Sequence, residues 1–297
     1  MFIDLHNHVS LASLNYVGSN APIVSPEQLV AMQCEAGIDR GVLLPCLNPE
    51  AMHIVQSNED VLRVCAQYPE RFIPFCNIDP RQMFNHPGAP LGTVLEYYRE
   101  QGCKGIGEVA ANLSFDDPRM RNLFRHVEAV GFPLTFHIAS REGGTYGIVD
   151  ELGLPGLERA LQDFPKLSFL GHSQCFWSHI SGDVDATNWS SYPTGPVVPG
   201  GRVVELMRRY PTLHGDLSAG SGFTAVSRDP DFGYAFLEEF QDRVFFATDI
   251  CLPTQAGTVL IWLKQFLEEG HAAGRISDTV FAKVTHRNAQ RLLGLGG

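Results

Sequence analysis

The sequence lacks the features that indicate a nucleic-acid-binding, membrane-spanning or secreted protein. Its 297 residues carry a formal net charge of −11 and no cluster of Lys and Arg, which argues against a surface that binds polyanions. No apolar run reaches the roughly 18 residues of a membrane span, and no basic segment followed by a long apolar stretch stands at the start. We therefore expect a cytoplasmic protein whose partners include neither nucleic acid nor a membrane.

Disulfide bonds are also not expected. The seven cysteines include no C-x-x-C pair, and most of them lie inside apolar segments. A free cysteine in such a segment behaves as a small hydrophobic residue, and the thiols of a cytosolic protein stay reduced. These cysteines are therefore predicted to be reduced core residues.

The hydrophobic content bounds the size of the core. At 44% of the chain it is enough for a sizeable core. A chain of this length is compatible with one large α/β domain or with two smaller ones. A single domain, residues 1–297, is the starting hypothesis.

The first ten residues contain the feature on which the rest of the interpretation depends. Residues 2–5 form a short apolar run broken only by Asp4, and His6 and His8 follow at its C-terminal end. Residues i and i+2 of a strand point to one face, so the two imidazoles are predicted to project side by side, as suits a divalent metal. The H-x-H spacing alone is equally typical of two unrelated polar residues at a strand end.

Eight apolar runs separated by helical patterns predict a parallel sheet. The runs lie at 2–5, 40–46, 71–78, 104–109, 132–138, 167–172, 213–217 and 244–248. The helical patterns lie at about 25–37, 58–68, 91–101, 118–130, 157–164, 203–210, 234–240, 258–269 and 278–293. Eight such repeats in one domain of this length indicate an α/β fold of the (β/α)8 TIM-barrel type rather than an open sheet.

One long segment, at about 174–201, interrupts this alternation. It is polar, contains glycine and proline, and carries Trp177 and Trp189. Loops of this length in a compact domain are usually functional or disordered. Because the segment has two tryptophans and no charge run, we predict an ordered lid over the site. The Gly/Ser-rich residues 218–222 are predicted to form a turn.

Residues of the kinds that bind metals stand at or next to the C-terminal ends of the predicted strands. They are His6, His8, Glu108, His137, His172 and Asp249. In a (β/α)8 barrel these strand ends meet at one rim, where the chemistry takes place. Each residue alone has an ordinary structural explanation, such as a helix cap or a hydrogen-bonded core histidine. Their shared placement favours a metal centre.

The order of these residues resembles that of the amidohydrolase superfamily. DLHNH at 4–8, His137, His172 in LGH, and TD at 248–249 follow the order of that family, and THRNAQRLLGL at 285–295 is similar to the closing helix of the amidohydrolase-2 branch, which is related to the amino-carboxymuconate semialdehyde decarboxylases. Glu108 in GIGEVA is more similar to the TatD-type hydrolases, in which a carboxylate bridges two metals. The carbamylated lysine of the urease-like branch has no counterpart.

The resemblance implies a metal-dependent hydrolase that acts on a small-molecule amide, ester or lactone through a metal-activated water. His6, His8 and Asp249 would bind one divalent ion. His137 would either complete that site or join His172 and Glu108 around a second ion. Zinc is the default metal, with manganese, iron or cobalt as alternatives. Asp249 would also carry the proton to the leaving group, and with a single metal His172 would polarise the substrate carbonyl or assist proton transfer.

Substrate contacts are less determined. Arg141, four residues beyond His137, is predicted to reach an anionic group, although a solvated loop arginine explains it equally well. Trp177 is predicted to line the pocket, although packing of the long segment onto the barrel is an equal alternative. His214 and Asp216 receive no role.

Other functions remain open at this stage. The same site could orient a carboxylated substrate for non-oxidative decarboxylation, which is the alternative to hydrolysis. A non-enzymatic metal-binding barrel is a third hypothesis, but a purely structural site needs no carboxylate placed as a base. A polymerase-and-histidinol-phosphatase-type barrel shares the DLHNH opening but needs further metal histidines after it. The substrate is expected to be a small molecule, and a homo-oligomer is left open.

Overall fold

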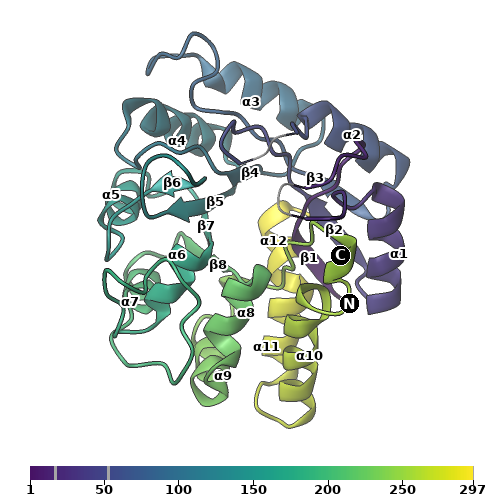
Figure 1. Cartoon of the computed structure of the whole chain (residues 1–297), viewed down its shortest axis with the longest axis vertical. Helices are drawn as coiled ribbons and strands as arrows, with labels where there is room; N and C mark the ends of the chain where they lie inside the picture. The colour runs from purple at the N-terminus through teal and green to yellow at the C-terminus, as the bar shows by residue number, and fades with distance from the viewer. Residues whose placement is uncertain (17–18, 52–53, 297) are drawn as a thin grey trace.

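The computed structural model describes residues 1–16, 19–51 and 54–296. Its strands gather at the centre of the molecule, and its helices surround them (Figure 1). The strands are β1 (Ile3–Asn7), β2 (Arg40–Leu43), β3 (Phe72–Pro74), β4 (Ile106–Val109), β5 (Leu134–Ala139), β6 (Ile148–Val149), β7 (Phe169–His172), β8 (Leu213–Asp216) and β9 (Val244–Phe245). All eight predicted runs overlap a strand. Strand β6 is an addition that pairs with β5, and its Val149 forms a parallel bridge with Ser114.

The strands pair in parallel and close into a ring. They form two sheets, in the orders β1-β2-β3 and β4-β5-β7-β8-β9. Beyond β3, Cys76 forms a parallel bridge with Ile106 at the start of β4. Beyond β9, Ile250 forms one with Asn7 of β1. These contacts join the two sheets at both edges, and the (β/α)8 prediction is confirmed.

The helices lie between and after the strands. They are α1 (Pro26–Ala36), α2 (Asn58–Gln67), α3 (Leu91–Glu100), α4 (Pro118–Val130), α5 (Pro155–Asp163), α6 (Gln174–Trp177), α7 (Arg202–Arg209), α8 (Ala219–Ser227), α9 (Pro230–Glu239), α10 (Val259–Ala272), α11 (Asp278–Ala282) and α12 (Asn288–Leu293). In the described part of the chain, none of them combines the length and the apolar character that a membrane crossing needs.

A cluster of buried apolar side chains fills the inside of the ring. It contains Ile3, Leu5, Val42, Leu44, Ile73, Phe75, Leu170, Phe245 and Ala247, with Ala289 and Leu293 of α12. Residues of β2 and β7, which lie in different sheets, can share a cluster only inside the barrel. A larger cluster packs the outer faces of the strands against the helices. The barrel is therefore a packed scaffold that holds the ends of its strands in place.

The predicted turn at 218–222 is wrong, because these residues begin helix α8. Glycines in this stretch suggest a turn from the sequence, but Gly222 has a packing role. A Cβ atom at Gly222 would lie 2.3 Å from the carbonyl carbon of Leu217. Because Gly222 has no side chain, helix α8 can pack closely against Leu217, directly after β8. This requirement arises from tertiary packing and is not visible in the local sequence pattern.

Two other segments differ in detail from the sequence interpretation. The helix expected at 278–293 is interrupted by a π-helical turn, Lys283–Arg287, between α11 and α12. The segment 174–201 begins with α6 and a 3-10 turn, Ser178–Ile180, and Trp177 and Trp189 are buried within it. Two large aromatic side chains therefore anchor this segment to the barrel.

Candidate metal centre

The six predicted ligand residues meet at the C-terminal ends of the strands. They are His6 in β1, His8 just after it, Glu108 in β4, His137 in β5, His172 at the end of β7, and Asp249 after β9. Five of them are buried, and the Asp249 side chain exposes 22% of its surface. Closure of the barrel brings together side chains from positions 6 to 249.

Four donor atoms lie close together at the centre of the site. The Nε2 atoms of His6 and His8 are 3.1 Å apart. Glu108 Oε2 lies 3.6 Å from each of them, and Asp249 Oδ1 lies 3.6 Å from the first and 3.5 Å from the second. Ligand atoms bonded to one zinc ion at about 2.0–2.2 Å are roughly 3.0–3.6 Å from one another. His6, His8 and Glu108, whose ligand atoms all lie within 4.8 Å of one another, therefore form a first donor group that fits a single divalent ion, and Asp249 Oδ1 lies beside both histidines.

The other oxygens of the two carboxylates face a second pair of histidines. Glu108 Oε1 lies 2.7 Å from His137 Nδ1 and 3.7 Å from His172 Nε2. Asp249 Oδ2 lies 3.7 Å from the same His172 atom. Glu108 therefore spans both groups, and its carboxylate stands where it could bridge two ions. The donor set accommodates one ion or two.

His6 and His8 are oriented through the ring nitrogens that face away from the first donor group. His6 Nδ1 lies 2.6 Å from Asp216 Oδ2, and His8 Nδ1 donates to the carbonyl oxygen of Leu44 at 3.0 Å. A hydrogen on Nδ1 leaves the lone pair of Nε2 free for a metal. Both rings are therefore prepared as ligands before an ion binds.

Asp216 supports the site from behind, a role that the sequence interpretation missed. Besides His6, its carboxylate accepts a hydrogen bond from the backbone N–H of Ser218 at 3.0 Å. Ser218 Oγ in turn lies 2.8 Å from His172 Nδ1. The position of Asp216 at the end of β8 is the signal that could have identified it, since the other site residues share that placement.

Asp4 connects the first and last strands beneath the site. Its carboxylate accepts hydrogen bonds from the backbone N–H and the hydroxyl of Thr248, at 2.9 and 2.6 Å. Burial raises the pKa of Asp4 to about 7, although these hydrogen bonds act in the opposite direction. Asp249, which follows Thr248 in the chain, adopts a left-handed φ of 57° that aspartate tolerates better than most residues. Its backbone N–H donates to the carbonyl oxygen of His6 at 2.9 Å.

The charges of the site favour ionised carboxylates. Burial opposes the ionisation of Glu108, but hydrogen bonds from His137, His6 and His8 outweigh it and hold the pKa of Glu108 well below its ordinary value. Burial likewise opposes protonation of His6, but the charges of Asp216 and Asp249 raise the pKa of that imidazole well above its ordinary value. The site thus concentrates negative charge that a cation would neutralise.

The donor atoms open into a cavity of about 50 Å³. Its described lining residues are His8, Tyr16, Ile23, Cys46, Ala51, Glu108, Tyr146, Asp249 and Cys251, with no Lys or Arg among them. The ring centroid of Tyr146 lies 4.5 Å from that of His137. Burial and the negative charges of Glu108 and Asp249 raise the pKa of Tyr146, so its hydroxyl keeps its proton at neutral pH. Tyr146 lies in a loop after β5, where no sequence pattern marks it.

Neither predicted substrate-binding residue is among the described residues that line this cavity. Arg141 is exposed in the loop after β5, and its carbonyl oxygen accepts a hydrogen bond from Asn112 Nδ2 at 3.1 Å. Trp177 is only 2% exposed, and its Nε1 donates to the carbonyl oxygen of Asp216 at 2.9 Å. The burial of Trp177 supports a packing role beneath the site, and substrate binding by Arg141 stays a prediction.

The segment 174–201 starts at the same rim of the barrel, directly after β7. Its residues Tyr192 and Pro193 line a small depression next to α8, and the cavity wall comes from other loops. Closure of the segment over the site stays a prediction.

The comparisons with known proteins bear on both fold and family. Residues 196–295 match the amidohydrolase family model, and no curated protein matches the chain. Among solved structures, an uncharacterized TIM-barrel protein from Bordetella bronchiseptica is similar over 99% of this chain and 98% of its own, with a TM-score of 0.66 and 19% identity.

Several of the similar barrels have stated activities. A probable 2-pyrone-4,6-dicarboxylic acid hydrolase from Acinetobacter baumannii is 13% identical, with a TM-score of 0.59 over 99% of both chains. A dihydroxybenzoic acid decarboxylase from Polaromonas sp. JS666, solved with bound manganese, is 17% identical, with a TM-score of 0.60 over 99% of this chain and 97% of its own. At these identities the likeness establishes the fold alone. The family match over residues 196–295, together with that fold, supports the resemblance to the amidohydrolase-2 branch that the sequence motifs indicate.

Proposed function

We propose that this protein is a metal-dependent hydrolase of a neutral small-molecule amide, ester or lactone. The observation that carries this proposal is the charge of the cavity. Glu108 and Asp249 face it, and its described lining contains no Lys or Arg. One divalent ion would be balanced by these two carboxylates, which leaves no excess positive charge to attract an anionic substrate. A neutral acyl group suits this environment better than a carboxylated one.

The residues that would hold the ion are those of the first donor group, His6, His8 and Glu108, with Asp249 beside the two histidines. When bound, the metal supplies Lewis acidity that polarises a carbonyl and lowers the pKa of a water. Imidazole and carboxylate ligands suit zinc, which we propose first, and also manganese, iron and cobalt. His137 and His172 would hold a second ion with the remaining carboxylate oxygens.

Asp249 is the proposed base. It is the most exposed of the ligand side chains, and its two oxygens lie 3.5 Å from His8 Nε2 and 3.7 Å from His172 Nε2. From there its carboxylate can accept a proton from the attacking water and return it to the leaving group. Burial lowers the pKa of His172, so this imidazole is neutral and can accept a hydrogen bond in support.

The test is a screen of purified protein, loaded in turn with zinc, manganese and cobalt, against neutral lactones, esters and amides. We expect turnover in which one oxygen atom from ¹⁸O-labelled water enters the acid product, measured by mass spectrometry. The matched variant Asp249→Asn keeps the shape of the side chain but removes the base. A folded, metal-loaded protein that hydrolyses none of these substrate classes would falsify the proposal.

A non-oxidative decarboxylase is the second candidate. The fold likeness to a manganese-containing dihydroxybenzoic acid decarboxylase favours it. The same screen therefore includes carboxylated aromatic compounds, with released CO₂ as the readout. Release of CO₂ without hydrolysis of any acyl substrate would assign the protein to this class. The cytoplasmic location and a homo-oligomeric state stay predictions.

A further inference from the structure

Gln56 has a buried carboxamide without a partner. The residue is 3% exposed, and neither Oε1 nor Nε2 of its side chain has a hydrogen-bond partner within the part of the chain that the structure describes. Burial removes both atoms from bulk water, and native proteins rarely leave such a group unsatisfied. The carboxamide therefore calls for a partner from outside the chain.

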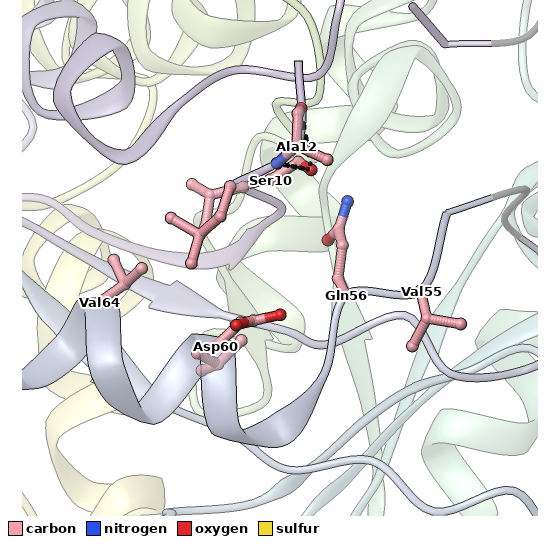
Figure 2. A pocket seen from close by; sticks show the side chains of 9 residues that line it. Ser10, Ala12, Val55, Gln56, Asp60 and Val64 are labelled. Atoms are coloured by element: carbon pink, nitrogen blue, oxygen red, sulfur yellow. Dashed lines mark hydrogen bonds between the residues drawn. The ribbon is translucent and has the colours of Figure 1, made fainter. Parts of the chain in front are cut away.

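That carboxamide lines a pocket of about 260 Å³ between the segment after β1 and helix α2 (Figure 2). The amide end of Gln56 points into the space between Asp60 on α2 and the stretch from Ser10 to Ala12. The other described lining residues are apolar: Val9, Leu11, Val55, Val61 and Val64. The pocket is large enough for several waters or one small organic molecule.

The polar groups of the pocket favour a neutral ligand with N–H donors. Ser10 Oγ is already paired, because it accepts from the backbone N–H of Ala12 at 3.0 Å. Asp60 has a partly exposed carboxylate, and its ion-pair partner Arg63 lies 3.8 Å away and is itself largely exposed. A carboxylate at the rim repels anions and attracts N–H groups. Gln56 and Asp60 are thus the groups left to recognise a ligand.

The pocket is separate from the metal cavity but shares a wall with it. The backbone N–H of Gln56 donates to the carbonyl oxygen of Cys46 at 3.0 Å, and Cys46 Sγ lies 3.4 Å from His8 Nδ1. Val9, which lines the pocket, directly follows His8. The described linings of the two cavities have no residue in common.

We propose that this pocket is a second small-molecule site, which binds a neutral compound with a primary carboxamide on a small apolar body. A primary carboxamide offers a donor and an acceptor side by side, so it can pair with both unpartnered atoms of Gln56. Its second N–H is available to the Asp60 side of the pocket, and the four valines contact its apolar body. This site is independent of the hydrolase proposal and is not affected by its failure.

The experiment titrates benzamide into protein with ¹³C-labelled valine methyl groups and follows the resonances of Val9, Val55, Val61 and Val64. We expect saturable shifts of these methyls in the wild-type protein. Gln56→Leu replaces the carboxamide with an apolar group of similar size. Benzamide affinity is expected to fall roughly tenfold or more in this variant, because two hydrogen bonds are lost. Gln67→Leu, at the exposed C-terminal end of helix α2, is the matched control and keeps the wild-type affinity.

A second comparison uses the wild-type protein alone, so that the test holds even if Gln56→Leu does not fold. N,N-dimethylbenzamide retains the carbonyl group and the ring but has no N–H, and its affinity falls by roughly tenfold or more. The proposal is overturned if the four methyls do not shift up to the solubility limit of benzamide. It is also overturned if benzamide binds equally well to Gln56→Leu, or if the dimethyl compound binds as tightly as benzamide.

Discussion

The two sides of the candidate metal centre are organised differently. On one side, His6 and His8 are each held from behind, by Asp216 and by a backbone carbonyl, and their Nε2 atoms converge 3.1 Å apart. On the other side, His137 already contacts Glu108 at 2.7 Å through Nδ1. The first side is prepared for an ion, whereas on the second side an ion must take the place of an existing contact.

This difference implies an order of affinity. Ligands that are fixed before binding lose little conformational freedom when the ion arrives, and partners behind them strengthen the site. We therefore expect the first donor group to bind an ion tightly and the group at His137 to bind a second ion more weakly. The predictions below test this contrast, beginning with the largest expected effect.

Removal of a ligand from each side is the most direct test. The double variant His6→Ala/His8→Ala is expected to lose at least nine tenths of its bound metal, because two of the three donors of the first group disappear. His137→Ala is expected to keep the first ion and lose only a second one. Elemental analysis of gel-filtered protein, with circular dichroism as the check on folding, measures both. Equal metal loss in the two variants contradicts the contrast.

Asp249 touches both sides, so its substitution separates metal binding from chemistry. Asp249→Asn is expected to fold, to retain at least part of its metal and to lose roughly 10²–10⁴ in kcat on the substrate found in the screen. The reason is that the amide keeps one oxygen donor but cannot accept the proton. Wild-type turnover in metal-loaded Asp249→Asn would show that the proton is handled elsewhere, and His172 is then the next residue to replace.

The contact between Asp216 and His6 should account for part of the higher metal affinity of the first donor group. Asp216→Asn is expected to weaken metal binding roughly 10- to 100-fold, because the carboxylate no longer holds the His6 ring and raises its basicity. Ser218→Ala removes the 2.8 Å contact to His172 and a longer contact of 3.3 Å to His6, and it leaves Asp216 in place, so it should change the first binding step less. Competition with a chromophoric chelator gives both constants. A larger effect of Ser218→Ala than of Asp216→Asn would reverse the proposed order.

The smallest predicted effect is on stability and comes from His214, a histidine outside the donor groups. It serves as a reference for the histidines of the site. His214 lies on β8 with Asp216, and its buried Nδ1 has no partner within the described residues. Burial, with the charges of Arg243 and Arg291, lowers the pKa of His214 to about 4, against 6.5 when unfolded. Between these values the unfolded chain binds more protons, so stability falls as pH decreases from about 6.5 to 4.

The expected loss through His214 is no more than about 2 kcal/mol at pH 5. It is measured as the difference in the free energy of unfolding between wild type and His214→Leu, by urea titration at pH 5 and pH 7 in the presence of a chelator. The variant should lose less stability between the two pH values. Parallel curves for the two proteins would show that His214 is already paired or protonated.

The sequence was informative where a pattern extended over a whole element. The apolar runs predict the barrel because strands of a parallel sheet are buried on both faces and read as continuous hydrophobic segments. The prediction was weaker where an element depends on its neighbours. β6 has only two residues and forms because the end of β5 offers an unpaired edge. Helix α8 replaces a predicted turn because Gly222 permits close packing that a side chain would prevent.

For the site, the sequence by itself determined which residues stand at strand ends, and with the fold this was enough to collect His6, His8, Glu108, His137 and the other two candidates at one rim. Only the tertiary structure decided which ring nitrogen faces the donor group and that Asp216 lies behind His6. The same is true of the unpartnered carboxamide of Gln56. The physical reason is that these features are distances of a few ångströms between residues far apart in the chain, as between His6 and Asp216 at 2.6 Å, and closure of the barrel sets them.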